Sequence, residues 1–116
     1  MTLEEVKRIL ECEVITGEDR LGMEIKTGCG CDMMSDVLAF IKADSLLLTG
    51  LANRQAVRTA QVADIRAIVF VRGKRPDPET IALANEMQLP ILVTKLLLYE
   101  ACGRLYANGL PGCGGN

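Results

Sequence analysis

Three apolar segments of this 116-residue chain end in polar side chains, the first two with a glycine among them: LLLTGLANRQ at 46–55, IVFVRGKRPD at 68–77 and ILVTKL at 91–96. In the first segment, Gly50 lets the backbone come close to a ligand, and Thr49 and Asn53 offer short hydrogen-bonding side chains. Arg58, just over one turn into the helix that follows, adds a positive charge near the free N–H groups of the helix start. This pattern predicts an anion site. The alternative is that Thr49 and Asn53 only cap the helix and that Arg58 is a solvated surface residue.

The second and third segments add cations and a hydroxyl group. The loop after residue 71 gathers its charges around one glycine, with Arg72, Gly73, Lys74 and Arg75. Guanidinium groups bind phosphate and carboxylate bidentately, so this loop is a candidate clamp; the alternative is a glycine turn with solvated charges. Because the carboxyl ends of parallel strands meet at one sheet edge, we expect Arg72 and Gly73 to lie beside Thr49 and Thr94.

A separate candidate is the loop GEDR at 17–20, which contributes Glu18, Asp19 and Arg20. Adjacent acids can bind a metal or activate water, but neighbours on an extended loop point apart, and no second carboxylate pair is obviously fixed nearby. A structural ion pair or a backbone cap is the alternative role for Asp19 and Arg20. We retain both as candidate ligand-binding residues and expect no metal site.

Cysteines are the metal-like feature of the chain. Cys29 and Cys31 form a C-x-C pair that could join Cys12 or Cys113 around a soft metal, or act as a redox pair. Zinc and iron–sulfur sites usually show C-x₂-C or longer spacings, so the signal is weak. The cysteine count of five is odd and no export signal accompanies it, which indicates reduced thiols. We expect neither metal nor cofactor.

Composition excludes several classes of function. Histidine is absent, which removes the commonest general acid and base, Ser-His and Cys-His nucleophile pairs, and every His-containing zinc site. A net charge of -2 gives no electrostatic case for nucleic acid. No apolar run reaches the roughly 20 residues that span a bilayer, and the N-terminus has no apolar signal core. We expect a soluble cytoplasmic protein without catalytic residues.

Apolar periodicity and capping signals predict the elements of the fold. They indicate helices at 3–10, 33–42, 54–64, 78–88 and 95–108 and strands at 12–16, 23–26, 45–49, 67–71 and 91–93, with loops at 17–22 and 27–32. Alternating strands and helices predict an α/β fold, a small and mostly parallel sheet with helices on both faces, to which the first half can add antiparallel edge strands. Residues 1–108 are expected to form a single domain, and 109–116 a flexible glycine-rich tail.

Four strings occur in order between Cys12 and Tyr106: ECEVITGEDRL, SDVLAFIKADSLLLTGLANRQAVRTA, AIVFVRGKRPDPETIALANEMQLPILVT and EACGRLY. The series resembles a stand-alone DRTGG domain. Such domains resemble the N-terminal domain of HPr kinase/phosphorylase, and they occur in phosphotransacetylases and in pyrophosphatases with nucleotide-sensing CBS domains. The resemblance implies a small α/β fold, self-association and a regulatory role, and its candidate signature residues are Asp19, Arg20, Thr49, Gly50 and Gly73. It does not imply kinase activity, because Gly73-Lys74 is not part of a Walker A loop.

The last predicted helix, KLLLYEACGRLYANG, is apolar on more than one face. Such a helix must be covered on both sides, by core neighbours or by a twin subunit, and the family resemblance favours a homodimer. We therefore expect a non-catalytic regulatory or ligand-binding module that senses a nucleotide or phosphorylated metabolite. The alternative is a homodimeric interaction or assembly domain that acts on an unidentified partner protein. A deep cleft uniting loops 17–20, 49–53 and 72–75 would favour a ligand, and a flat edge with a large apolar patch would favour assembly.

Overall fold

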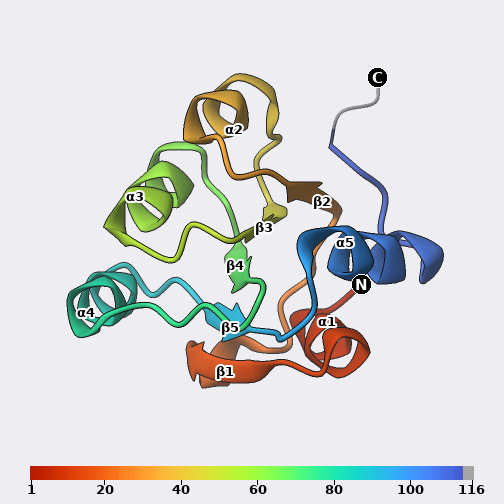
Figure 1. Ribbon diagram of the computed structural model, residues 1–116, viewed down its shortest axis with the longest axis horizontal. Helices are drawn as coiled ribbons and strands as arrows, with labels where there is room; N and C mark the ends of the chain where they lie inside the picture. Colours follow the sequence, from red (N-terminus) through yellow and green to blue (C-terminus); the bar gives the residue numbers. More distant parts are fainter. Residues whose placement is uncertain (114–116) are drawn as a thin grey trace.

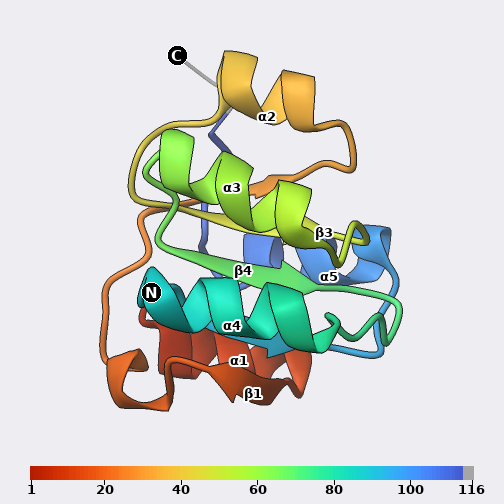
Figure 2. The ribbon, with the colours of Figure 1, turned by 90° about the vertical axis from the view of Figure 1, so that its left-hand side faces the viewer.

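The computed structural model describes residues 1–113, which form three layers around a five-stranded sheet (Figure 1). The strands are β1 (Glu13–Thr16), β2 (Thr27–Gly30), β3 (Ser45–Thr49), β4 (Ala67–Phe70) and β5 (Ile91–Val93). The helices are α1 (Leu3–Leu10), α2 (Met34–Phe40), α3 (Arg54–Val62), α4 (Pro78–Glu86) and α5 (Leu98–Ala107). Helices α1 and α5 cover one face of the sheet, and α2, α3 and α4 cover the other (Figures 1 and 2). The predicted α/β fold with helices on both faces is confirmed.

The strand order is β1-β5-β4-β3-β2. Strands β2 to β5 run parallel, whereas β1 is antiparallel to β5. The carboxyl ends of the four parallel strands therefore lie at one edge of the sheet, which we call the carboxyl edge, and the end of β1 lies at the opposite edge. The first half thus adds one antiparallel edge strand, as the sequence allowed.

Strand β3 shows why the central strands are continuously apolar. Leu46 and Leu48 point into the core beneath α1 and α5, and Leu47 points into the core beneath the other three helices. All three side chains are buried, because a parallel sheet with helices on both faces has no wet side.

Side-chain caps place several helix starts where the sequence predicted them. Thr2 and Glu5 form a reciprocal capping box at α1. The Asn53 side chain accepts a hydrogen bond from the backbone N–H of Ala56, and the Asp77 side chain accepts one from that of Thr80. These contacts satisfy backbone donors that a helix start leaves free. None of the described helices is long and apolar enough to cross a bilayer.

The expected loop at 27–32 and strand at 23–26 are wrong, since β2 occupies 27–30. A Cβ on Gly30 would lie 2.4 Å from the Cys102 sulfur, and a Cβ on Gly28 would lie 3.0 Å from the side chain of Leu110. The glycines therefore mark a strand against which other segments pack directly, and not a turn. Pairing with β3 supplies the hydrogen bonds that sequence propensity did not indicate.

The C-terminal segment also differs from the expected flexible tail. Leu110 and Cys113 are buried, and Gly112 forms a parallel bridge with Gly28 of β2. Residues 110–113 therefore pack alongside β2, the outermost strand of the sheet. Strand β2 offers them unpaired backbone groups, and α5 offers an apolar surface. Residues 114–116 of the expected tail lie outside the described residues.

Candidate functional site

At the carboxyl edge, the turn after β3 is held by a carboxylate from the turn after β2. Asp32 Oδ1 accepts a hydrogen bond from the Thr49 hydroxyl at 2.8 Å and one from the Gly50 backbone N–H at 2.7 Å. The Thr49 oxygen in turn accepts from the N–H of Leu51 at 3.2 Å. The donors that the sequence offered for an anion are thus engaged by an internal anion, the Asp32 side chain.

Arg72 from the neighbouring turn lies against the same place. A Cβ on Gly50 would lie 2.4 Å from Arg72 Nη2 and 3.0 Å from its Cζ, so only glycine leaves room for this guanidinium. Arg72 has a φ of 62°, and its backbone N–H donates to the Leu96 carbonyl at 2.8 Å. The next residue, Gly73, donates to the Thr94 carbonyl at 2.9 Å. Strand β5 therefore fixes the loop that presents Arg72.

We call Asp32, Thr49, Gly50 and Arg72 the edge cluster. Thr49 and Gly50 are buried, whereas Asp32 and Arg72 are exposed. Among the described residues, neither Arg72 nor its neighbour Lys74 forms an ion pair. The cluster therefore combines a solvent-facing guanidinium with a buried hydroxyl and a buried backbone N–H, the donor types that bind phosphate oxygens.

The third cation of the 72–75 loop is engaged elsewhere. Arg75 donates from both terminal nitrogens to Glu13 of β1, at 2.7 and 2.9 Å. Hydrogen bonding from Arg75 holds the pKa of Glu13 below its ordinary value. Arg75 and Glu13 line a hollow of about 440 Å³ together with Thr94 and Lys95. Arg75 thus ties the antiparallel edge strand to this loop and does not point its charge at the edge cluster.

Three of the predicted ligand-binding residues lie outside the edge cluster and have other roles: Asn53, Arg58 and Thr94. Asn53 caps α3. Arg58 is exposed and lines a shallow hollow with Leu38 of α2, apart from the edge cluster. The buried Thr94 hydroxyl donates to the Leu10 carbonyl at 2.7 Å and so joins β5 to α1. The helix expected at 95–108 begins only at Leu98, so Thr94 does not lie at its start.

The 17–20 loop lies at the opposite edge of the sheet. Because β1 is antiparallel, its carboxyl end adjoins the start of β5, and Arg20 Nη2 donates to the Gln88 side chain at 2.6 Å. Asp19 and Arg20 line a hollow of about 120 Å³ there. The cleft uniting loops 17–20, 49–53 and 72–75, which would have favoured a ligand, therefore does not form, because β1 runs against the other four strands.

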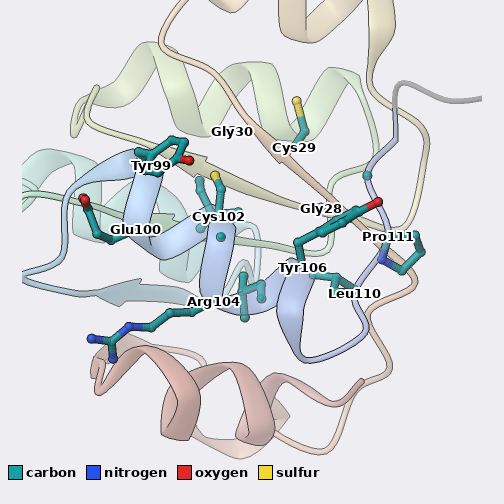
Figure 3. A pocket seen from close by; sticks show the side chains of 14 residues that line it. Gly28, Cys29, Gly30, Tyr99, Glu100, Cys102, Arg104, Tyr106, Leu110 and Pro111 are labelled. Carbon is teal, nitrogen blue, oxygen red and sulfur yellow. The ribbon is translucent and has the colours of Figure 1, made fainter.

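An apolar groove lies between α5, β2 and the C-terminal segment (Figure 3). It has a volume of about 460 Å³ and is lined mainly by Gly28, Gly30, Tyr99, Cys102, Gly103, Tyr106, Leu110 and Pro111. Tyr99 and Tyr106 lie two turns apart on α5 and are 86% and 72% exposed. This α5–β2 groove was not predicted, because its far wall belongs to segments that the sequence placed in a loop and a tail.

The cysteines do not assemble into a metal centre. No group of three or more Cys, Asp or Glu side chains within residues 1–113 has the geometry to hold a metal ion. Cys12 lies beside α1, whereas Cys29 lies on β2 at the other side of the sheet. Of the partners that the sequence offered to Cys29, the structure brings Cys113 close and leaves Cys12 distant.

These features define a small three-layer α/β domain whose loops meet at the carboxyl edge of a parallel sheet. The chain belongs to the DRTGG domain family, whose sequence model matches residues 5–107. The fold is similar to that of the CBS and DRTGG domains of the regulatory region of Clostridium perfringens pyrophosphatase, solved in complex with its activator, diadenosine tetraphosphate. The TM-score is 0.71 at 20% identity, and the similarity covers 95% of this chain and 47% of the other. This chain thus spans about half of that regulatory region. No curated protein sequence matches it.

Asp32 is the residue of the edge cluster that sequence reasoning missed. Its signal was present, since an acid follows a strand and precedes a helix at CGCDMM. Only after 27–30 is recognised as a parallel strand does Asp32 fall on the same edge as Thr49 and Arg72.

Proposed function

We propose that this chain is a non-catalytic regulatory module of the cytoplasm that binds a nucleotide or another phosphorylated metabolite at the edge cluster. The observation that carries the proposal is the Arg72 guanidinium lying exposed over Gly50, next to two donors that already hold a carboxylate. Like Asp32 Oδ1, a phosphate oxygen is an anionic hydrogen-bond acceptor. It would replace that oxygen and gain the guanidinium as a further partner.

Replacement of Asp32 also provides a route to regulation. Asp32 connects β2 to α2, and α2 begins at Met34 without any side-chain cap. When a phosphate takes the Thr49 and Gly50 donors, the Asp32 carboxylate loses both partners and the turn at 31–33 is released. The ligand would thereby shift the population of α2 positions by its differential affinity for the two states.

Two further observations support a regulatory role without catalysis. The C. perfringens region with a similar fold is a regulatory region complexed with a nucleotide activator. The present chain contains no histidine and no Walker A loop, so it lacks the commonest general acid and base and the phosphate-binding loop typical of phosphoryl transfer.

Thermal unfolding with and without pyrophosphate and ATP tests the proposal. We expect both ligands to raise the melting temperature of the wild-type protein, and Arg72→Ala to abolish the rise. Arg58→Ala removes an exposed arginine outside the cluster, so its response should remain that of the wild type. The Asp32→Asn variant should bind pyrophosphate and ATP roughly fivefold more tightly. Its uncharged amide competes with the phosphate for the Thr49 and Gly50 donors through hydrogen bonds that are weaker by about 1 kcal/mol. Equal responses of the Arg72→Ala and Arg58→Ala variants would contradict the site.

A second function, a homodimeric assembly domain without a small ligand, is favoured by the exposed face of α5. In an antiparallel pair of α5 helices about a two-fold axis near Gly103, Tyr99 of each copy would meet Tyr106 of the other. The open space at Gly103 lets the helices approach closely.

Sedimentation separates this function from the first. A dimer that becomes monomeric in Tyr106→Arg, combined with no response to pyrophosphate or ATP, would support assembly alone. A monomer at micromolar concentration would exclude the antiparallel pair.

A further inference from the structure

The C-terminal segment continues the sheet beyond β2 by one short pairing. Gly28 donates its backbone N–H to the Pro111 carbonyl at 2.9 Å, and its carbonyl accepts from the N–H of Cys113 at 3.2 Å. These two bonds define the parallel bridge between Gly28 and Gly112. Leu110 packs where a Gly28 side chain would otherwise stand.

This register sets Cys29 beside Cys113. In a parallel pair, the residues that follow a bridge lie opposite one another with side chains on the same face. Gly28 and Gly30 face α5, so Cys29 faces the other way, and Figure 3 shows its sulfur pointing away from α5. The strand spacing of about 4.8 Å falls within the Cα separation of about 4.4–6.8 Å that a disulfide requires.

The chemical environment agrees with this placement. Burial raises the pKa of Cys29 to about 12, and the neighbouring Cys113 thiol is the next cause of the rise. Cys29 is half-buried and Cys113 is buried. The two thiols thus adjoin one another, and Cys29 is the more accessible.

We propose that Cys29 and Cys113 are a modification site, at which a reversible disulfide bonds the C-terminal segment to β2. This site is separate from the edge cluster and adds a redox function to the proposed ligand binding. Leu110, Pro111 and Gly112 form the far wall of the α5–β2 groove, so the disulfide controls whether that wall can move. Disulfides of reducing compartments are typically transient and redox-sensing, which fits a regulatory module.

A small disulfide such as oxidised glutathione is the oxidant. The Cys29 thiol, which its raised pKa keeps protonated at neutral pH, must first lose its proton to water. The thiolate so formed attacks one glutathione sulfur, the glutathione S–S bond breaks, and one glutathione thiolate leaves and takes up a proton. The Cys113 thiolate then attacks the Cys29 sulfur, breaks the mixed disulfide and releases the second glutathione. The protein thiols lose two electrons and two protons, and the electrons reduce the glutathione disulfide to two thiols.

The other cysteines are less suitable partners for Cys29. Cys31 follows two residues later, where strand geometry separates the Cβ atoms by about 6.6 Å, beyond the reach of about 4.5 Å in a disulfide. Cys102 lies on the α5 side of β2, against Gly30. Cys12 packs with the core beneath α1 and directly precedes β1, the outermost strand on the other side of the sheet from β2.

Peptide mapping after incubation of the reduced chain with oxidised glutathione tests the site. We expect a cross-link joining the peptides of Cys29 and Cys113, and alkylation under denaturing conditions at the remaining three of the five thiols. The cross-linked protein should melt higher by on the order of 10 °C, because the bond closes a long loop of the unfolded chain.

Serine variants make the test specific. Cys29→Ser and Cys113→Ser should each abolish the cross-link and the rise in melting temperature, and Cys12→Ser should retain both. Melting of the reduced variants near the wild-type temperature verifies that they fold. Five alkylated thiols, glutathione adducts without a cross-link, or a Cys29 bond to Cys31 would overturn the proposal.

Discussion

The contact between Gly50 and the Arg72 guanidinium can be measured with a double-mutant cycle. Gly50 does not have a positive φ, so alanine fits its backbone and should stabilise the fold by about 0.4–1 kcal/mol through the unfolded state. In the wild-type background, however, the new Cβ would stand 2.4 Å from Arg72 Nη2 and force the side chain away. If the Cβ pushes the Arg72 side chain off its staggered rotamer, the strain costs about 0.5–1.5 kcal/mol. In the wild-type background, the stabilisation by alanine and the strain in Arg72 nearly cancel. In the Arg72→Ala background, only the stabilisation by alanine remains.

Urea unfolding gives the free energies for the cycle. We expect Gly50→Ala to be close to neutral in wild type and stabilising in Arg72→Ala, with a coupling energy on the order of 1 kcal/mol. Gly22→Ala is the matched control, because nothing lies near its Cβ and its loop is at the opposite edge, so its effect should be the same in both backgrounds. Identical effects of Gly50→Ala in the two backgrounds would refute the contact between the guanidinium and Gly50.

Three further predictions concern the groove, the edge and the thiols. Gly30→Ala should lower the free energy of unfolding by about 1–3 kcal/mol, because its Cβ would overpack against the Cys102 sulfur. Gly103→Ala lies in open space on α5 and should raise that free energy by about 0.5–1 kcal/mol. Urea titration measures both changes. Asn53→Ala should cost roughly 1 kcal/mol in the same assay by removing the cap of α3; an unchanged midpoint would deny the cap. Folding raises the pKa of Cys29 from 9.0 to about 12, so the protonated thiol is favoured and its contribution to stability is lost as pH rises through that window. The urea midpoint should therefore fall as the pH rises above about 9, and it should fall less in Cys29→Ser.

Local signals were sufficient for most elements of this fold. At α4, the order Asp77, Pro78, Glu79 supplies a cap, a preset φ and an early acid, so the helix start is determined within a few residues. Strand β3 was equally clear, because a buried parallel strand needs apolar residues on both faces. Such features depend on neighbours in the sequence, and the sequence therefore predicts them.

Features that depend on distant contacts were not predictable in this way. Glycines in β2 looked like a loop because the reason for them, close packing of α5 and Leu110, comes from residues far along the chain. Thr94 was offered as a hydroxyl for the anion site, but it donates to the carbonyl of Leu10, which is 84 positions away. The candidate site changed for the same reason, since the direction of β1 placed Asp19 away from the carboxyl edge and the pairing of β2 brought Asp32 to it.

The binding of a phosphate group at the edge cluster is the central claim, and amide NMR during a titration with ATP tests it most directly. If ATP replaces the Asp32 carboxylate, the Gly50 amide, which now donates to that carboxylate, should shift progressively and saturate. The shift should vanish in Arg72→Ala and persist in Arg58→Ala. A Gly50 amide that does not move at millimolar ATP, or that moves equally in both variants, would contradict the account.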